Sequence, residues 1–338
     1  MPPRILIFGT GSLGITYGWV LSRAVPESNI TAVCRSNYDI AMKEGFVLNS
    51  TIWGNDHHMR PRVVRSVSEA ITQSQEPFDY ILVTTKVLPS TASTPELIRP
   101  AITPGKTAVV LVQNGIRIED EYARLYTGDD VPILSTVAYL TAHRTAPNVA
   151  SHEMLEHLHV GTYPAAGVPA THKLAAQAFV DLIKSGGATA ILHDDIQAQR
   201  WDKAVINGSW NPICALTRLR DKEFLDFGQG KAKQGGKDEH GRLIRDVMLE
   251  IASVAQACGY KNVNEKAVDF ILERTVRFTS PGIKPSMLVD AIEERSLEID
   301  AIVGNVVKTA DEKDVPVPLL RTVYLLAQGL SGSFSLAK

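Results

Sequence analysis

The chain has 338 residues, of which 44% are apolar and 21% charged, and its formal net charge at pH 7 is −2. That length is enough for two domains with separate hydrophobic cores, and the composition is typical of a soluble globular protein. The near-neutral charge argues against nucleic acid and anionic membrane as partners, because both attract a broadly basic surface.

The cysteines, Cys34, Cys214 and Cys258, are scattered without a C-x-x-C spacing, which is typical of reduced thiols inside a cell. No apolar run approaches the roughly 18 residues that a membrane helix needs. The sequence enters a predicted strand at Arg4 with no signal peptide before it. We therefore expect a cytoplasmic protein.

A phosphate-binding loop is predicted directly after the first strand. The apolar run 4–8 predicts a buried parallel strand, Gly9-Thr10-Gly11-Ser12-Leu13-Gly14 follows it, and a helix is predicted over 15–24. In this context Gly9 permits the turn, Gly11 lets the backbone approach a pyrophosphate, and Gly14 lets the helix pack against the strand. Residues 9–14 are therefore predicted to bind a dinucleotide at the helix N-terminus.

Arg35 indicates which dinucleotide. A second strand is predicted over 31–34, and Arg35 follows it, about twenty residues beyond the glycines, where an NAD-binding domain usually has an acid. A guanidinium binds a ribose 2′-phosphate through paired hydrogen bonds, so the sequence favours NADP(H) over NAD(H). The alternative is a solvated loop residue that binds no ligand.

Two further predicted strands, 79–85 and 107–113, end at Lys86 and at Asn114-Gly115. Ligands of an open α/β sheet lie beyond the carboxyl ends of its strands, so Lys86 and Asn114 are candidate ligand contacts. Asn-Gly is also a common turn signal. Strands are predicted over 131–140, 155–161 and 188–193, with a helix over 170–185.

The histidines do not predict a metal site. His152, His157 and His159 lie close together in the sequence, and His193 precedes two aspartates. No Cys or acidic cluster completes a recognisable set of ligands, so we predict no metal.

The second half of the chain is predicted to be helical, which divides it into domains 1–194 and 195–338. Helices are predicted over 197–219, 243–258, 265–278 and 318–330, with a kink at Pro212 in the first of them. The Gly- and Lys-rich stretch 227–241 predicts a surface loop.

Lys203, Asn207 and Asn211 form a polar column on the first of these helices. Their spacing of four residues rotates the column by only about 40° per step. A cation and two carboxamides in line suit a small polar ligand, although the same pattern is also typical of a solvated helix face.

The segment 284–300 predicts two helix starts. Ser286 and Ser296 are candidate N-caps, and Glu298 then falls in the first turn of the second helix, where the helix dipole stabilises a carboxylate. A structural role at this helix end is the alternative to a functional one for Glu298.

Together these motifs resemble the ketopantoate reductase (2-dehydropantoate 2-reductase) family over nearly the whole chain. The resemblance rests on the glycine loop with Arg35, on Lys86, on Asn114-Gly, on Lys203-x-x-x-Asn207-x-x-x-Asn211-Pro, and on Ser286-Met-x-x-Asp290 with Glu298-Ile-Asp. It implies an N-terminal Rossmann-type domain, a helical C-terminal domain, and NADPH-dependent reduction of ketopantoate to pantoate for coenzyme A synthesis. A homodimer is compatible with these expectations.

The resemblance also implies roles for the residues. Lys203 would be the general acid, Glu298 would orient Lys203 or bind the substrate hydroxyl, and Lys86 would line the cofactor site. The substrate would be bound by Asn207, Asn211, Ser286 and Asn114, the last also near the nicotinamide.

Two features depart from the family pattern. Ile283 stands where members often carry Asn, and the stretch 227–241 is longer than in compact bacterial members. The alternatives are therefore an NADPH-dependent reductase of another small 2-oxo acid or ketone, and a non-catalytic NADPH-binding regulator. A proton donor such as Lys203 argues against the regulator.

Overall fold

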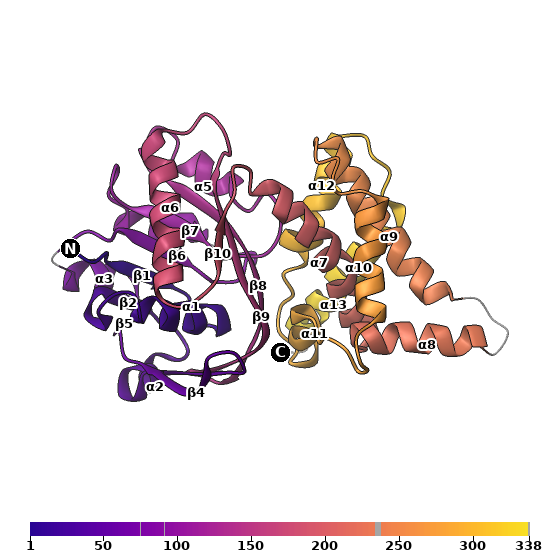
Figure 1. Cartoon of the computed structure of the whole chain (residues 1–338), viewed down its shortest axis with the longest axis horizontal. Coiled ribbons are helices and arrows are strands. Elements are labelled where there is room, and N and C mark those ends of the chain that lie inside the picture. The colour runs from indigo at the N-terminus through magenta and orange to yellow at the C-terminus, as the bar shows by residue number, and fades with distance from the viewer. Residues whose placement is uncertain (75, 91, 234–237, 337–338) are drawn as a thin grey trace. The chain divides into compact units, whose positions relative to one another are not determined.

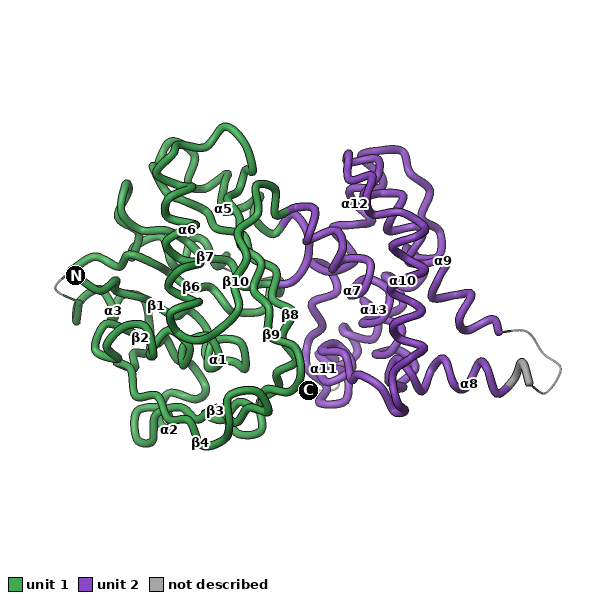
Figure 2. Tube along the Cα trace, in the orientation of Figure 1, with its two compact units in different colours: residues 1–113, 118–196 green, residues 114–117, 197–338 purple. Residues whose placement is uncertain are grey.

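In the computed structural model, which describes residues 1–74, 76–90, 92–233 and 238–336, the chain divides into two compact units (Figure 2). The first unit comprises Met1–Gln113 and Ile118–Ile196, and the second Asn114–Arg117 and Gln197–Lys338. This division differs from the predicted boundary after residue 194 chiefly at Asn114–Arg117. That segment groups with the second unit because its hydrogen bonds are made to helices of that unit.

Among the described residues, a ten-stranded sheet forms the centre of the first unit (Figure 1). Its strand order is β4-β3-β9-β8-β7-β6-β1-β2-β5, and β10 also pairs with β9. The part from β8 to β5 is parallel throughout, whereas β8 and β9 form a long antiparallel pair. The strands are β1 (Ile5–Phe8), β2 (Ile30–Val33), β3 (Phe46–Ser50), β4 (Gly54–Met59), β5 (Arg62–Val64), β6 (Tyr80–Val83), β7 (Ala108–Leu111), β8 (Ile133–Ala146), β9 (Val149–Tyr163) and β10 (Ala190–Leu192).

The parallel strands end level with one another. Phe8, the last residue of β1, pairs in register with Val33 of β2 and Val83 of β6, and Val83 pairs with Leu111 of β7. These strands are buried along their whole length, as expected for a sheet covered on both faces. The segments that follow them therefore leave the sheet at one edge.

Helices pack on this sheet through apolar side chains. Phe179 of α6 is fully buried, and the centroid of its ring lies 5.3 Å from the centroid of the Tyr80 ring on β6. Figure 1 shows α6 running across the sheet. The helices of this unit are α1 (Ser12–Ser22), α2 (Tyr38–Glu44), α3 (Val67–Gln73), α4 (Thr94–Ile98), α5 (Asp120–Leu125) and α6 (Ala170–Ser185).

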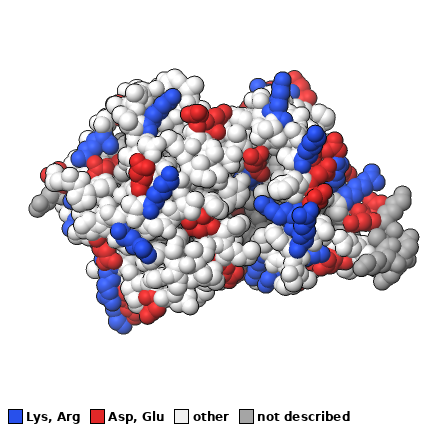
Figure 3. Space-filling view, viewed as in Figure 1, with Lys and Arg blue, Asp and Glu red and all other residues white. Residues whose placement is uncertain are grey.

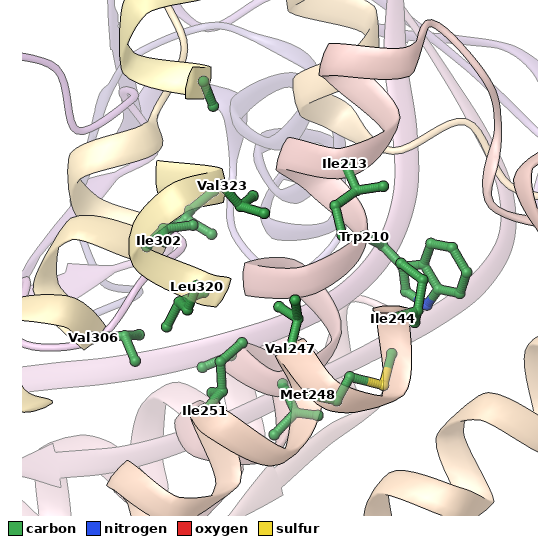
Figure 4. Close-up of a cluster of buried hydrophobic side chains, with 14 of the residues drawn as sticks. Trp210, Ile213, Ile244, Val247, Met248, Ile251, Ile302, Val306, Leu320 and Val323 are labelled. Carbon is green, nitrogen blue, oxygen red and sulfur yellow. The ribbon is translucent and has the colours of Figure 1, made fainter. Parts of the chain in front are cut away.

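The described part of the second unit is built from helices around a separate core (Figure 4). Trp210 and Ile213 of the first helix, α7, pack there with Met248, Ile251 and Leu320, all almost completely buried. The helices are α7 (Gln197–Thr217), α8 (Asp221–Lys233), α9 (Glu239–Ala257), α10 (Glu265–Val276), α11 (Ser286–Ile292), α12 (Asn305–Glu312) and α13 (Pro318–Leu336), with a π-helical turn at Asp300–Gly304. The predicted fold class, a Rossmann-type domain followed by a helical domain, is confirmed.

Several local predictions were wrong. Residues 227–233 belong to helix α8 rather than to a loop, and 234–237 lie outside the described residues. Ser286 opens α11 without a capping hydrogen bond, and Ser296 precedes the next helical turn without capping it. Strands β3, β4 and β5 had no clear sequence signal because they are short or polar.

In the part of the chain that the structure describes, no helix is long and apolar enough to cross a membrane. Basic and acidic side chains are interspersed on the face seen in Figure 3, in line with the formal charge of −2.

Candidate active site

The loop between β1 and α1 requires glycine at two positions. Gly9 has a φ of +106°, and a Cβ there would lie 2.8 Å from the backbone nitrogen of Thr85. A Cβ on Gly14 would lie 2.0 Å from the carbonyl oxygen of Gly9, so only glycine lets α1 start so close to the strand. Gly11, at the N-cap of α1, has open space where a Cβ would be and supplies no side-chain cap. The first N–H groups of the helix are thus left for an anion.

Asn37 joins the turn after β2 to this glycine loop. Its buried Nδ2 donates to Thr10 Oγ1 at 2.9 Å and to the Thr10 carbonyl at 3.3 Å. Arg35 is exposed, and its guanidinium carbon lies 6.0 Å from the centroid of the Phe8 ring. Arg35 therefore lies at the carboxyl edge of the sheet, where a dinucleotide-binding fold receives the adenosine ribose.

Lys86 is exposed and follows the end of β6 at the same edge. The loop that carries it is tied to the glycine loop, since Thr84 Oγ1 donates to the Gly9 carbonyl at 2.5 Å. The first unit therefore contains the residues predicted to bind the cofactor, except Asn114: Gly9, Thr10, Gly11, Ser12, Leu13, Gly14, Arg35 and Lys86.

A second group of predicted site residues lies in the second unit, on and around α7. Lys203 Nζ donates a hydrogen bond of 2.9 Å to Oδ1 of Asn114. Asn114 and Lys203 are 89 residues apart in the sequence, but both belong to the second unit. Two residues chosen from separate motifs are thus in direct contact.

The segment Asn114–Arg117 is held by two of its carbonyls and by the side chain of Arg117. Arg200 Nη1 donates to the Gly115 carbonyl at 2.7 Å, and Asn305 Nδ2 donates to the Ile116 carbonyl at 2.8 Å. Arg117 pairs with Glu312 at 2.6 Å. These bonds come from α7 and α12, so the position of Asn114 relative to Lys203 is set by the helical unit.

Burial controls the acidity of Lys203. Burial, and after it the positive charge of Arg200, lower the pKa of the ammonium, while the carboxylate of Glu298 raises it, and together they bring it from 10.5 to about 8. Glu298 is itself only 7% exposed. An ammonium with this pKa is protonated at neutral pH and still able to give up its proton near it.

The rest of the column includes a buried donor without a partner. Asn211 is 4% exposed, and its Nδ2 has no hydrogen-bond partner among the residues that the structure describes. Buried amide groups are nearly always hydrogen-bonded, so this donor can still take a partner such as a ligand oxygen. Asn207 is partly buried one turn earlier, and Ser286 is exposed at the start of α11, which packs against α7.

The histidines of the metal question, His152, His159 and His193, belong to the first unit. His159 Nδ1 lies 2.7 Å from His193 Nε2, while His152 is bonded to Ser50 and to the Leu155 carbonyl. Burial lowers the pKa of His193. Across the described ranges, no group of three or more His, Cys, Asp or Glu side chains is arranged to hold a metal ion.

Two models of known protein families match this chain. The model described as "Ketopantoate reductase PanE/ApbA" matches residues 5–165, and "Ketopantoate reductase PanE/ApbA C terminal" matches residues 195–331. The chain belongs to the ketopantoate reductase family. Membership of this family indicates an oxidoreductase that uses a nicotinamide dinucleotide.

Individual relatives differ in what is known of them. An uncharacterized protein of Saccharomyces cerevisiae is 28% identical over 96% of this chain and 92% of its own length. The crystal structure of 2-dehydropantoate 2-reductase from Methylococcus capsulatus is 31% identical, with a TM-score of 0.80 over 98% of both chains. A structure of D-mandelate dehydrogenase with NADH and anilino(oxo)acetate shares the fold, at 20% identity and a TM-score of 0.78 over 98% of this chain and 99% of that one.

Sequence reasoning missed the residues that support Asn114. Arg200 lies three residues before Lys203 on α7, a spacing that places both on one helix face, so its signal was present. Asn305 had no such signal, because its contact with Ile116 spans 189 residues. Glu298 also differs from prediction: its carbonyl accepts the first helical bond, from Ile302, so it precedes the helix rather than lying in its first turn.

We predict that Gly115→Ala displaces Asn114. Gly115 has a φ of +102°, and a Cβ there would lie 2.3 Å from the Ala301 carbonyl oxygen. Strain and clash together are expected to destabilise the protein by about 2–4 kcal/mol in urea unfolding. Gly128→Ala is the matched control, because Gly128 has a φ of +86° with nothing within 4 Å of its Cβ position. Equal losses in the two variants would show that the Ala301 contact does not constrain the segment.

Proposed function

We propose that the chain is an NADPH-dependent reductase that converts 2-dehydropantoate (ketopantoate) to pantoate. The observation that carries this proposal is the contact of the Lys203 ammonium with Asn114, in a site where its pKa is about 8. Reduction of a ketone needs a hydride at the carbonyl carbon and a proton at the oxygen. When bound, the nicotinamide supplies the hydride.

Lys203 acts as the general acid. Its ammonium donates a hydrogen bond to the substrate carbonyl, stabilises the negative charge that develops on the oxygen, and transfers its proton there, so that the ketone becomes a secondary alcohol. Oδ1 of Asn114 accepts one hydrogen bond from the Lys203 ammonium, which has three N–H groups in all. Glu298 keeps Lys203 charged and orients it or binds the substrate hydroxyl.

Asn207, Asn211 and Ser286 bind the carboxylate and hydroxyl groups of the substrate. The buried Nδ2 of Asn211 supports this assignment, because a substrate oxygen would satisfy it. On the cofactor side, the open space at Gly11 and the uncapped start of α1 fit a pyrophosphate, Lys86 lines the dinucleotide site, and Arg35 fits a 2′-phosphate.

A second candidate is the reduction of a different small 2-oxo acid or ketone on the same scaffold. Ile283 favours it, since an apolar side chain stands where an amide would bind a polar substituent; the Ile283 backbone is held by the buried Asp221 carboxylate at 2.7 Å. A panel of 2-oxo acids that lack the hydroxymethyl group separates the two reactions. Tight NADPH binding without oxidation by any of them would instead identify a non-catalytic regulator.

The direct test follows NADPH oxidation by the purified protein with ketopantoate. Lys203→Ala is expected to reduce kcat by at least ~10²-fold, the usual contribution of a general acid. Lys308→Ala, which removes an exposed lysine of α12 in the same unit, is the control and should leave kcat unchanged. Near-normal turnover in Lys203→Ala would remove this residue from the mechanism.

The pH profile provides an independent measurement. Because the pKa of Lys203 is lowered to about 8, the ammonium is protonated below pH 8 and loses its proton above it. We expect kcat for reduction to be constant below pH 8 and to fall about tenfold per unit above it. A rate that stays level to pH 10 would contradict a general acid with this pKa.

Arg35→Ala tests the choice of dinucleotide. Removal of the guanidinium should weaken the binding of NADPH at least ~10-fold and leave that of NADH nearly unchanged, because only NADPH carries the 2′-phosphate. Dissociation constants from nicotinamide fluorescence titrations measure both. An equal loss for the two dinucleotides would show that Arg35 does not bind the 2′-phosphate.

A further inference from the structure

A second arginine, Arg65, follows a strand that ends at the same edge of the sheet as the strand before Arg35. Strands β2 and β5 are parallel neighbours with Val33 opposite Val64, and the Cys34 N–H donates to the Val64 carbonyl at 2.8 Å. Arg65 is the first residue after β5, and Arg35 the second after β2. Their backbones therefore lie on adjacent strands, beside the turn that Asn37 ties to the glycine loop.

The side chain of Arg65 lies over an aromatic ring. Its guanidinium carbon lies 3.8 Å from the centroid of the Tyr38 ring, a close cation–π contact. Its backbone is fixed as well, since the Arg65 N–H donates to the Glu69 carboxylate at 2.7 Å and Ser66 caps α3. A stacked guanidinium keeps its in-plane N–H groups available for an anion at its edge.

The carboxylate of Asp39 already accepts a hydrogen bond at the edge of the Arg65 guanidinium. Arg65 Nη2 donates to Asp39 Oδ1 at 2.7 Å, while the two side chains are 59% and 88% exposed. An ion pair between such exposed groups is weak, because water screens it. A phosphate dianion carries more charge and more acceptor oxygens than a carboxylate, so it would displace Asp39 from Arg65.

We propose that Arg65, stacked on Tyr38, is a second determinant of the preference for NADPH and binds the 2′-phosphate in place of Asp39. This inference rests on the proposed function for its choice of dinucleotide. Asp39 is then a competing anion that weakens NADPH binding, through its pairing with Arg65 and through repulsion of the phosphate. Tyr38 is a positioning residue, since it acts only through the orientation of the guanidinium.

The test measures dissociation constants for NADPH, NADH, adenosine 2′,5′-bisphosphate and AMP on the full chain, by calorimetry at fixed ionic strength. Arg65→Ala should weaken the binding of the two 2′-phosphorylated ligands by about 5–20-fold and leave the binding of NADH and AMP unchanged. Tyr38→Leu should weaken the binding of the same two ligands by a smaller factor. Asp39→Asn should have the opposite effect and bind both 2′-phosphorylated ligands about 2–5-fold more tightly.

Arg62→Ala is the matched control, because Arg62 is an exposed arginine at the other end of the same strand, bonded to the Gln73 carbonyl. It should leave all four constants unchanged. Unchanged NADH binding in Arg65→Ala also shows that this variant is folded.

The outcomes separate this inference from the proposed function. If the unmodified protein binds NADPH at least tenfold more tightly than NADH and Arg65→Ala keeps that ratio, the role of Arg65 is wrong and the proposed cofactor stands. If the unmodified protein binds NADH as tightly as NADPH, the proposed cofactor choice fails first, and the role of Arg65 fails with it. Weaker NADPH binding in Asp39→Asn would likewise overturn the competition between Asp39 and the phosphate.

Discussion

The level register of the parallel strands is the constraint on which the first unit depends. Because Phe8, Val33, Val83 and Leu111 lie in one row, the segments that follow β1, β2, β6 and β7 all leave the sheet at one edge. Ligand-binding groups in a parallel sheet gather at that edge for this reason alone. Asn37 and Thr84 then bind the neighbouring loops to Thr10 and Gly9, which converts a shared edge into a fixed surface.

The second unit holds a protonated amine, that of Lys203, in a partly buried position. Burial and Arg200 both disfavour the charge on Lys203, while Glu298 favours it, and the balance leaves a pKa of about 8. The acceptor for the amine, Asn114, comes from a distant part of the chain. It stays in place because Arg200 and Asn305 bind the peptide groups that follow it, so the same arginine tunes the lysine and positions its partner.

The sequence predicted the features that local chemistry decides. The glycine loop, the polar column of α7 and the four parallel strands β1, β2, β6 and β7 each follow from a short stretch of sequence, and the structure has them close to the predicted places. It failed where packing decides: the Gly- and Lys-rich stretch continues α8 to Lys233, and the serines at 286 and 296 are not caps. Family recognition was correct because its motifs are spread over both halves of the chain.

By itself, then, the sequence predicted the parallel strands β1, β2, β6 and β7, the glycine loop after β1, and Lys203 as the candidate proton donor. Only the tertiary structure decided that Asn114 touches Lys203 across 89 residues, that burial makes the lysine acidic, and that Arg65 lies stacked on Tyr38 beside the strand that ends at Arg35. The physical reason is that periodicity and turn chemistry act over a few residues. Desolvation, charge coupling and strand register depend on groups that are neighbours in space and far apart in the chain.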